Sequence, residues 1–356
     1  MMKAQRHTVT RKTRQIRVLT WNVENLFHPE TGGPRHDYTP DKGWTLTRYG
    51  EKIRRLAAAI TALMQRTGSR TPCIIGLTEV EDLRVVNDLL AQLPERFDVA
   101  IDQAFPHAYH DAVILYDRDF FTLGQCTYHA TFRRHEKGDV VQADFRLGKG
   151  KKHRLSVFCC HLKARPHNQY YTAMYRQAVC DNVQNLVWRL HSGHRVQEQM
   201  RRLPSDAEKP KGLVLDQPIV IMGDFNDQPF SQSITDYLMA TYDKHYVATQ
   251  QDVDKVALYN CAWEGLQGCR PGSLYYEHSV TTKWSMLDQI IIAPHLLHVD
   301  SAIRYVPASF EVMQDVSADC HGRPFACASY NADGELEWHD GYSDHFPVGI
   351  ALECDV

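Results

Sequence analysis

The apolar residues of the chain form short continuous runs that alternate with longer stretches of helical periodicity. The short runs predict strands, because they are rich in β-branched residues and end at polar or turn-forming residues. These runs occupy residues 16–22, 73–77, 112–116, 154–161, 218–223, 286–293 and 347–353. Apolar residues spaced at i, i+3, i+4 and i+7 predict helices at 47–66, 83–93 and 171–190. Because strands and amphipathic helices are interleaved, we expect helices to cover sheets.

Several of the predicted strands are apolar on both sides, which indicates burial on both faces. A four-layer αββα sandwich satisfies both patterns, with two central mixed, mainly antiparallel sheets and helices outside them. The predicted fold class is therefore α/β in the broad sense that includes α+β. A doubly wound parallel sheet is the alternative that periodicity alone leaves open.

One domain is predicted from residue 16 to residue 356, since no linker or fixed-period repeat divides the chain. The polar stretch 193–216 has little periodicity and is interpreted as an exposed insertion. Segments 242–285 and 303–342 are rich in Gly, Tyr, Asp and His and are interpreted as long functional loops. Residues 1–15 form a basic arm that is expected to be disordered, either a tail without function or a phosphate-seeking segment.

Composition narrows the classes of function. The 356 residues are 43% hydrophobic and 23% charged, which is ordinary for a globular protein. The formal net charge of -3 provides no overall field that would attract nucleic acid or an anionic membrane. No secretory signal follows the basic start, and no apolar run approaches the ~18 residues of a membrane span. We therefore expect no stable membrane insertion. The ten cysteines form no CxxC pair, so we expect reduced thiols, a cytoplasmic location and no zinc site.

Polar side chains gather where the predicted strands begin or end. Side chains on a strand alternate between its two faces, so residues two apart share a face and can point into one cleft. The residues concerned are Asn22, Glu24, Glu79, His161, Lys163, Asp224, Asn226, Asp288, Asp344 and His345.

Oxygen ligands in this set predict a site for a hard divalent cation. Carboxylate and amide oxygens suit Mg²⁺, and Mn²⁺ can substitute for it. The candidate ligands are Asn22, Glu79 and Asp344, with Glu24 as an additional candidate.

The remaining residues offer the chemistry of phosphate-ester hydrolysis. His161 and His345 can donate hydrogen bonds to a phosphoryl oxygen, and Lys163 adds positive charge. Asp224 can accept a proton from an attacking water that Asn226 orients. Together with a metal ion, these groups supply a Lewis acid, an in-line nucleophile and stabilisation of developing charge.

Taken singly, most of these residues have an interpretation without catalysis. Asn22, Asp224 and Asn226 could be turn formers, and Glu79 could be the first-turn acid of the following helix. His161 could be a core histidine and Lys163 a solvated lysine. Asp288 fits such an interpretation poorly, because a carboxylate inside an apolar strand needs a partner, and His345 is a suitable one. Their joint occurrence at strand ends favours an active site.

The chain resembles the endonuclease/exonuclease/phosphatase superfamily, which includes pancreatic deoxyribonuclease and abasic-site endonucleases. The resemblance runs in family order from residue 18 to residue 352. Its motifs are "LTWNVENLF", "IIGLTEVED", "HDAVILYDRDF", "FCCHLKAR", "IVIMGDFNDQPFS", "SMLDQIIIA" and "YSDHFPVGIAL". The resemblance implies an αββα sandwich with a cleft along one edge of its two central sheets.

The same resemblance implies roles for single residues. Asn22 and Glu79 would serve the metal site with Asp344, and Glu24 matches a position that is acidic in some abasic-site nucleases. In the catalytic set, Asp224 would activate water, Asn226 would aid positioning, His161 and His345 would contact the scissile phosphate, and Asp288 would orient His345.

Two stretches depart from the family pattern. Relatives often carry Arg or Ser and then Gly before the strand at 112–116, whereas this chain has Tyr109 and His110, which makes His110 a candidate phosphate contact. The inositol-polyphosphate 5-phosphatase signature is absent, since the chain reads "GDFNDQPF" and "WSMLDQI" at the corresponding places.

Three functions follow from these residues. The leading hypothesis is a Mg²⁺-dependent phosphodiesterase or nuclease that cleaves nucleic acid. The basic arm and the Tyr/His-rich loops would hold the backbone and the bases of the nucleic acid. The alternative is a phosphatase or phosphodiesterase for small-molecule or lipid head-group phosphates. The third is a binding protein that has the fold without catalysis. Endo or exo preference, the number of metal ions and the oligomeric state are left open.

Overall fold

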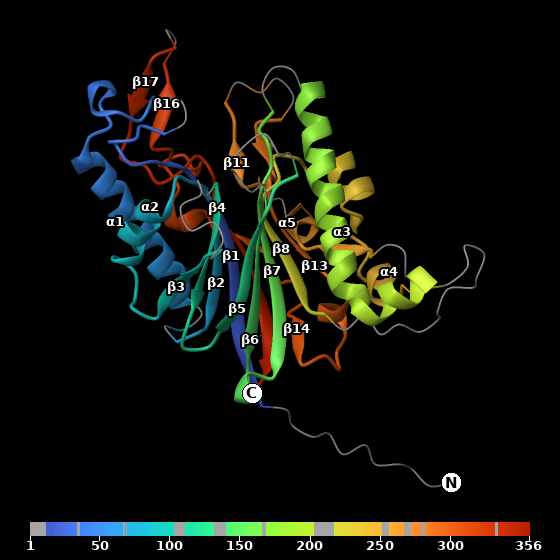
Figure 1. Cartoon of the computed structure of the whole chain (residues 1–356). Helices are drawn as coiled ribbons and strands as arrows, with labels where there is room; N and C mark the ends of the chain where they lie inside the picture. The colour runs from blue at the N-terminus through green and yellow to red at the C-terminus, as the bar shows by residue number, and fades with distance from the viewer. Residues whose placement is uncertain are drawn as a thin grey trace, which may run out of the picture.

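Two seven-stranded sheets pack face to face and helices cover both outer faces in the computed structural model (Figure 1). The predicted four-layer sandwich is confirmed, and the doubly wound alternative is wrong because there are two stacked sheets rather than one. The structure describes residues 12–33, 36–66, 68, 70–102, 111–131, 140–165, 169–202, 217–250, 256–266, 272–277, 279, 282–331 and 334–356.

The first sheet has the order β14-β18-β1-β2-β4-β3, with β15 paired to β18. Only the β1–β2 pair is parallel, so the sheet is mixed and mainly antiparallel. The strands are β1 (Thr13–Leu26), β2 (Cys73–Val80), β3 (Phe97–Ala100), β4 (Ala112–Asp117), β14 (Ile303–Tyr305), β15 (Glu311–Val312) and β18 (Val348–Asp355).

The second sheet has the order β5-β6-β7-β8-β13-β10-β9. Its β7–β8 and β9–β10 pairs are parallel and its other pairs are antiparallel. The strands are β5 (Thr122–His129), β6 (Val140–Leu147), β7 (His153–His161), β8 (Ile219–Asp224), β9 (Ala240–Thr241), β10 (Leu258–Asn260) and β13 (Asp288–Ile292).

Three apolar clusters match the three interfaces between the four layers. The cluster between the sheets holds alternate residues of their strands, such as Val18 in β1 and Val157 in β7. A second cluster packs α1 (Leu46–Arg66) and α2 (Leu83–Leu90) on the outer face of the first sheet. A third packs α3 (Gln169–Arg202) on the outer face of the second sheet. Strands that are apolar on both faces therefore have an apolar layer on each side.

Short elements complete the fold. The helices α4 (Lys244–Thr249) and α5 (Ala262–Leu266) lie within the expected loop 242–285, as does a small hairpin of β11 (Leu274–Tyr275) and β12 (Trp284–Ser285). A second hairpin of β16 (Ala328–Tyr330) and β17 (Leu336–Trp338) projects near β11 at the upper end of Figure 1. Single-turn helices are η1 (Pro40–Lys42), η2 (Lys149–Lys151), η3 (Ser233–Tyr237), η4 (Pro294–Leu297) and η5 (Gln314–Val316).

Two predicted boundaries need correction. Residues 13–15 were assigned to the basic arm, but they belong to β1 and pair with β18, where Thr13 lies opposite Asp355. The helix predicted at 171–190 continues to Arg202, so the first part of the polar stretch 193–216 is helical. Its remainder, and residues 1–11 of the arm, lie outside the described residues. No helix in the described part of the chain is long and apolar enough to cross a membrane.

Candidate active site

Four of the predicted site residues continue the inward-facing pattern of the core strands. Inward positions are mostly apolar along β1, β7, β8 and β13, and the alternation ends at Asn22, His161, Asp224 and Asp288. Three of these residues are in register, because Asp224 lies opposite both His161 and Asp288. The polar group therefore forms where the core between the sheets reaches one edge of the sandwich.

The backbone at this edge adopts conformations that most side chains avoid. Glu24, Glu79 and Asn226 have positive φ angles of 51°, 63° and 50°. Gly223 has a φ of 136°, and a Cβ atom there would lie 1.9 Å from the carbonyl oxygen of Cys160. Only glycine fits directly before Asp224, which explains the Gly-Asp pair of the motif. Such strained backbone concentrates at sites where the direction of a side chain matters.

Asn22 connects the two halves of the site. Its Nδ2 donates to Oε1 of Glu79 at 2.9 Å and to Oδ2 of Asp224 at 3.0 Å. Its Oδ1 accepts the backbone N–H of Glu24 at 2.9 Å. The second oxygen of Glu79 accepts the N–H of Asn25 at 2.8 Å. Asn22 therefore orients both carboxylates and keeps one lone pair of Oδ1 for a metal ion.

His345 and Asp288 form a buried pair, as the sequence predicted. His345 Nδ1 lies 2.6 Å from Oδ2 of Asp288, and its other nitrogen lies 4.0 Å from Oδ2 of Asp224. Burial lowers the pKa of His345, but the carboxylates of Asp288 and Asp344 raise it well above its usual value. The pair therefore presents a charged imidazolium N–H toward Asp224.

His161 is held in the same way by a residue that sequence reasoning missed. Its Nδ1 lies 3.0 Å from Oδ1 of Asp111, and its Nε2 lies 3.9 Å from both Glu79 and Asp224. Burial lowers the pKa of His161, but these three carboxylates together raise it to about 10. The rings of His161 and His345 thus both lie near Asp224, and each can donate a hydrogen bond to an oxyanion.

Asn226 positions the turn that follows Asp224. Its backbone N–H donates to Oδ1 of Asp224 at 2.8 Å, which is the Asx turn considered as an alternative. Its side-chain Nδ2 donates to the carbonyl of Leu162 at 2.8 Å, and Arg165 Nε donates to its carbonyl at 2.6 Å. Asn226 therefore forms the turn and also lies beside the site. Its hydrogen bonds connect the ends of β7 and β8.

Glu79 and Asp344 are the carboxylates best placed for a divalent cation. Both line one cavity of about 610 Å³. Burial raises the pKa of Glu79, the charge of His161 opposes that shift, and the carboxylate of Asp344 adds to it. A cation between the two carboxylates would relieve their repulsion. Their hard oxygen atoms fit Mg²⁺ or Mn²⁺.

A second group of possible ligands is less suitable. Asp224, Asp288 and His345 place one ligand atom each within 4.8 Å of one another. However, Asp288 is completely buried, and its Oδ2 already accepts a hydrogen bond from His345. We therefore interpret this group as proton-handling, and the open carboxylates Glu79 and Asp344 as the metal site.

Three candidates remain, of which Glu24 lines the same cavity with both oxygens engaged. Glu24 directs its two oxygens to the N–H groups of Cys327 and Ala328, at 2.6 and 2.8 Å, so it anchors a loop instead of offering a free ligand. Lys163 is exposed, and its Nζ lies 5.4 Å from the ring centre of Tyr175. His110 lies outside the described residues.

Two serines that the sequence analysis did not select also organise the site. Ser343 Oγ donates to the carbonyl of Asn22 at 2.6 Å and accepts the N–H of His345 at 3.0 Å. Ser273 Oγ accepts the N–H groups of Leu287 and Asp288, both at 3.1 Å. Ser343 directly precedes the Asp-His pair of the last motif, and this position was the one available signal for it.

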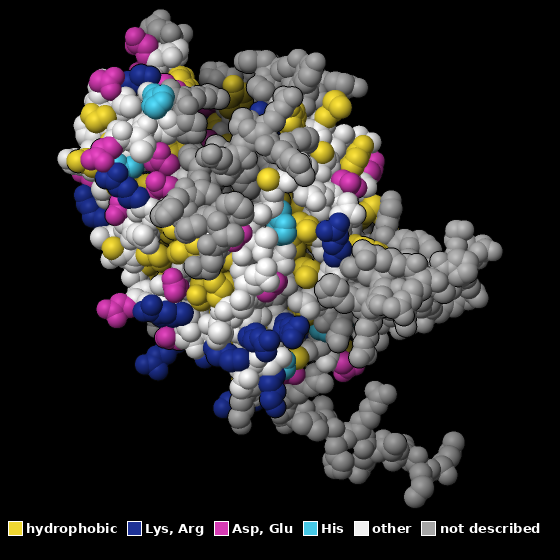
Figure 2. Space-filling view, in the orientation of Figure 1, with side chains coloured by type: hydrophobic (Ala, Val, Ile, Leu, Met, Phe, Trp, Pro, Cys, Tyr) yellow, Lys and Arg dark blue, Asp and Glu magenta, His cyan; other side chains and the backbone are white. Residues whose placement is uncertain are grey.

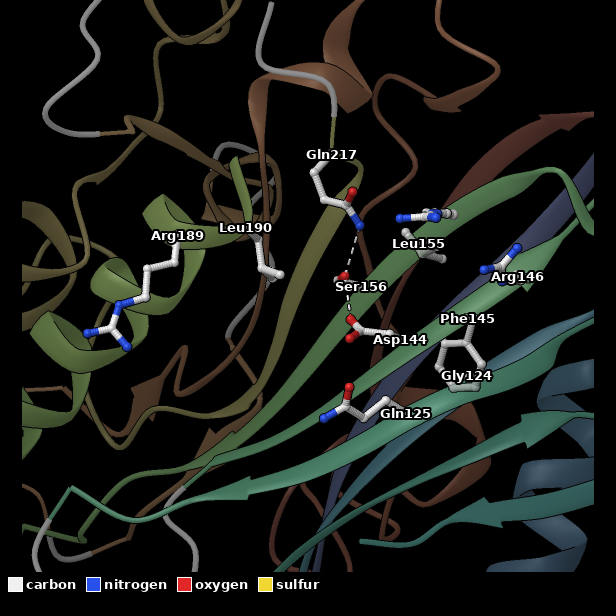
Figure 3. A pocket seen from close by; sticks show the side chains of 11 residues that line it. Gly124, Gln125, Asp144, Phe145, Arg146, Leu155, Ser156, Arg189, Leu190 and Gln217 are labelled. Atoms are coloured by element: carbon white, nitrogen blue, oxygen red, sulfur yellow. Dashed lines mark hydrogen bonds between the residues drawn. The ribbon is translucent and has the colours of Figure 1, made fainter. Parts of the chain in front are cut away.

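A separate cavity of about 720 Å³ lies on the outer face of the second sheet (Figure 3). Its floor carries a hydrogen-bond chain in which Gln217 donates to Ser156 at 3.1 Å, and Ser156 donates to Asp144 at 2.6 Å. None of the site residues above lines it. The larger cavity is thus on the opposite face of the sheet from the inward-facing His161 and Asp224.

Solved structures with this fold are similar to the chain over almost its full length. The mannosyl-6-phosphatase of Bacteroides thetaiotaomicron VPI-5482 has a TM-score of 0.52 at 16% identity, covering 95% of this chain and 99% of that one. The D. rerio TDP2 protein complexed with a single-strand DNA product has a TM-score of 0.50 at 12% identity, covering 95% and 98%. The beta toxin of Staphylococcus aureus with bound magnesium ions has a TM-score of 0.50 at 11% identity, covering 94% and 99%.

The sequence itself matches a family over most of its length. No curated protein matches the chain closely enough to count as a relative. Residues 17–194 and 209–354 match the family described as Endonuclease/Exonuclease/phosphatase, which agrees with the resemblance drawn from the motifs. The chain belongs to the Endonuclease/Exonuclease/phosphatase family.

Proposed function

We propose that the protein hydrolyses phosphate esters with the help of a divalent cation, for which Mg²⁺ is the best candidate. The observation that carries this proposal is the convergence of Glu79 and Asp344 on one cavity, beside Asp224 and two charged histidines. Glu79 and Asp344 would hold the cation, with Asn22 beside them. When bound, it would supply positive charge to the phosphoryl oxygens.

The chain's own residues have distinct roles in this proposal. Asp224 accepts a proton from a water molecule as the water oxygen bonds to phosphorus and the ester P–O bond breaks. His161 and His345 donate hydrogen bonds to the phosphoryl oxygens, where negative charge develops. Asp288 holds His345 at 2.6 Å in the orientation this requires. The departing ester oxygen leaves as an alcohol after it takes up a proton.

Two substrate classes fit this chemistry. Nucleic acid is supported by the DNA product bound to the D. rerio protein and by the basic arm. Small-molecule phosphates are supported by the Bacteroides phosphatase. Figure 2 shows Lys and Arg side chains of this face mainly at the lower end of the sheets, with others at the upper left and at the right.

Exposed basic residues lie at both ends of β7, and Lys163 and Arg165 follow His161 at the site end. Arg146 and Arg154 are opposite each other on β6 and β7. His161 follows Arg154 by seven residues along β7, a separation of about 23 Å at ~3.3 Å per residue. The positions of these cations therefore do not decide between the two substrate classes. A cytoplasmic location remains part of the proposal, supported by the free thiols of all nine described cysteines.

A panel of substrates tests the proposal. Plasmid DNA, a single-stranded oligonucleotide, bis-p-nitrophenyl phosphate and p-nitrophenyl phosphate are each incubated with Mg²⁺, Mn²⁺ or EDTA. We expect metal-dependent turnover of the small esters that EDTA abolishes. Nicking of the plasmid at a higher rate would favour the nuclease, and no metal-dependent turnover of any substrate would favour a binding protein.

A further inference from the structure

The metal-site cavity extends between two hairpins that project from the sandwich. Besides Glu79 and Asp344, its wall includes Leu274 to Glu277 around β11 and Ala328 to Tyr330 of β16. Tyr38 and Asp37, from the loop after β1, form another side. The cavity is therefore continuous with the site of hydrolysis and large enough for a group attached to the scissile phosphate.

The charged residues in the described lining of this cavity are acidic. Five acidic side chains and no Lys or Arg are among the described residues that line it: Glu24, Asp37, Glu79, Glu277 and Asp344. Burial raises the pKa of Glu24 to about 8, so Glu24 adds little negative charge at neutral pH. The cations nearest to these acids are already paired. Lys42 lies 2.7 Å from Asp37, and Arg323 and Lys283 lie 2.5 Å and 3.5 Å from Glu277. A polynucleotide carries a phosphate on every nucleotide and favours a path lined by cations, and no Lys or Arg belongs to the described part of this wall.

Tyrosine rings supply the remaining binding surface. Tyr276 at the end of β11 is 56% exposed, and Tyr330 at the end of β16 is 62% exposed, although both line the cavity. Tyr275 is fixed behind them by Trp284, at 5.0 Å between ring centres, and by the guanidinium of Arg323 at 4.7 Å. Such a surface suits a ligand ring with C–H bonds on its faces and hydroxyl groups at its edge. The C–H faces can pack on the exposed aromatic rings, and the hydroxyl groups can donate to the carboxylate and hydroxyl oxygens of the wall.

We propose that this cavity binds the leaving group of the substrate, and that this group is an uncharged sugar. The inference rests on the proposed function and narrows it to sugar phosphate monoesters. The faces of the sugar pack on Tyr276 and Tyr330, and its hydroxyls donate to the carboxylates and hydroxyls of the wall. Water adds to phosphorus, the sugar C–O–P linkage breaks at its P–O bond, and the sugar oxygen takes up a proton. The products are the free sugar and inorganic phosphate.

The test compares substrates that share a phosphate and differ in the leaving group. Release of inorganic phosphate is measured with Mg²⁺ for hexose and pentose phosphates, p-nitrophenyl phosphate, methyl phosphate and a 5′-phosphorylated oligonucleotide. We expect kcat/KM for the best sugar phosphate to exceed that for methyl phosphate and for the oligonucleotide by at least about tenfold. A higher kcat/KM for the oligonucleotide would overturn the inference.

Variants of the cavity wall give a second measurement. The double variant Tyr276→Ala/Tyr330→Ala should lose at least about tenfold in kcat/KM for the sugar phosphate, mainly through KM, with little change for methyl phosphate. The matched control is Tyr246→Ala, because Tyr246 is 55% exposed and lies on α4, away from the cavity. An equal loss for both substrates would contradict a role in binding the leaving group.

Failure of the proposed function has a different signature. In that case p-nitrophenyl phosphate is not hydrolysed either, and calorimetric titration with the same sugar phosphates in the presence of Mg²⁺ decides the inference. Binding that the double variant weakens would support the sugar site without catalysis. No binding, or binding that is the same in wild type and double variant, would overturn it.

Discussion

At the scale of single residues, the site divides its carboxylates into two kinds. Asp224 and Asp288 are buried and held by hydrogen bonds from neighbouring side chains or backbone. Glu79 and Asp344 line the cavity. Because a buried carboxylate in a fixed hydrogen-bond geometry has few alternative orientations, the first kind suits proton transfer and orientation, whereas the second suits a cation that needs space for water ligands.

Asp224→Asn tests the proton-accepting role. The amide has nearly the same shape and can still accept the N–H of Asn226, but it cannot take a proton from water. We expect kcat for p-nitrophenyl phosphate to fall by at least about 10²-fold. The melting temperature should also fall, because the new NH₂ group faces the Nδ2 of Asn22, which donates to Oδ2 of Asp224 in the wild type. Asp236→Asn is the control, since Asp236 is exposed on η3. A rate within about threefold of the wild type would exclude Asp224 as the base.

Much of the candidate site could be predicted from the sequence because strand ends carry the polar residues. Asn22, His161, Asp224 and Asp288 interrupt apolar alternation, and that interruption is visible without coordinates. Asp111 could not be found in this way. It lies at the start of β4, which is antiparallel to β2, and only that pairing brings it to the same edge as Glu79.

At the scale of elements, the contact between β7 and β8 determines where Asp224 points. The two strands are parallel neighbours, and Cys160 lies opposite Gly223. The Cβ position of Gly223 is so close to the carbonyl of Cys160 that any side chain would separate the strands. Since Asp224 is the next residue, a displacement at Gly223 also moves the proposed base.

Gly223→Ala is therefore expected to destabilise the protein and reduce its activity together. Positive φ and the backbone clash should both oppose the substitution, so we expect the free energy of unfolding to fall by about 1–3 kcal/mol or more. Gly50→Ala provides the contrast, because Gly50 lies within α1 and has no atom within 4 Å of the added methyl group. That variant should be stabilised by about 0.5–1 kcal/mol. Urea denaturation of both variants measures the difference, and a stability of Gly223→Ala equal to wild type would refute the proposed contact.

Two of the segments that the sequence analysis missed have weak apolar periodicity. β5 is an edge strand with only one buried residue, so its alternation of apolar and polar residues is weak. The end of α3 gave a weak signal as well, because residues 193–202 are mostly polar and continue the helix beyond its predicted apolar stripe. In β5, strand pairing specifies the structure without burial of a regular apolar face.

At the scale of the whole molecule, one carboxylate joins the two sheets. Glu264 on α5 accepts a hydrogen bond from Tyr259 of β10 at 2.9 Å and from Tyr305 of β14 at 2.6 Å. Lys244 Nζ on α4 lies 2.5 Å from its Oε1. Burial raises the pKa of Glu264, but these three donors lower it overall below the usual value. Its charged form is therefore favoured in the folded protein.

Glu264→Gln is expected to cost about 1.5–3 kcal/mol of stability at pH 7, the scale of hydrogen bonds to a charged group. A carboxylate whose pKa is lowered by folding stabilises the protein above its unfolded pKa, and this contribution is lost as the pH falls through the folded pKa. The gap between variant and wild type should shrink below about pH 4.5. Urea denaturation at neutral and acidic pH measures it, with the exposed Glu337→Gln as control. The same gap at both pH values would contradict this assignment.

The division of the site between two sheets has a consequence for how the proposed activity would be lost. Asn22 and Glu79 come from the first sheet, and His161, Asp224 and Asp288 come from the second. Neither half can therefore assemble the chemistry by itself. A slip of one sheet against the other by about 1 Å would lower the proposed turnover by about 10²-fold, while the far-ultraviolet circular dichroism stayed unchanged. On gradual heating, loss of turnover should thus be an early sign of misalignment and should precede the melting of secondary structure.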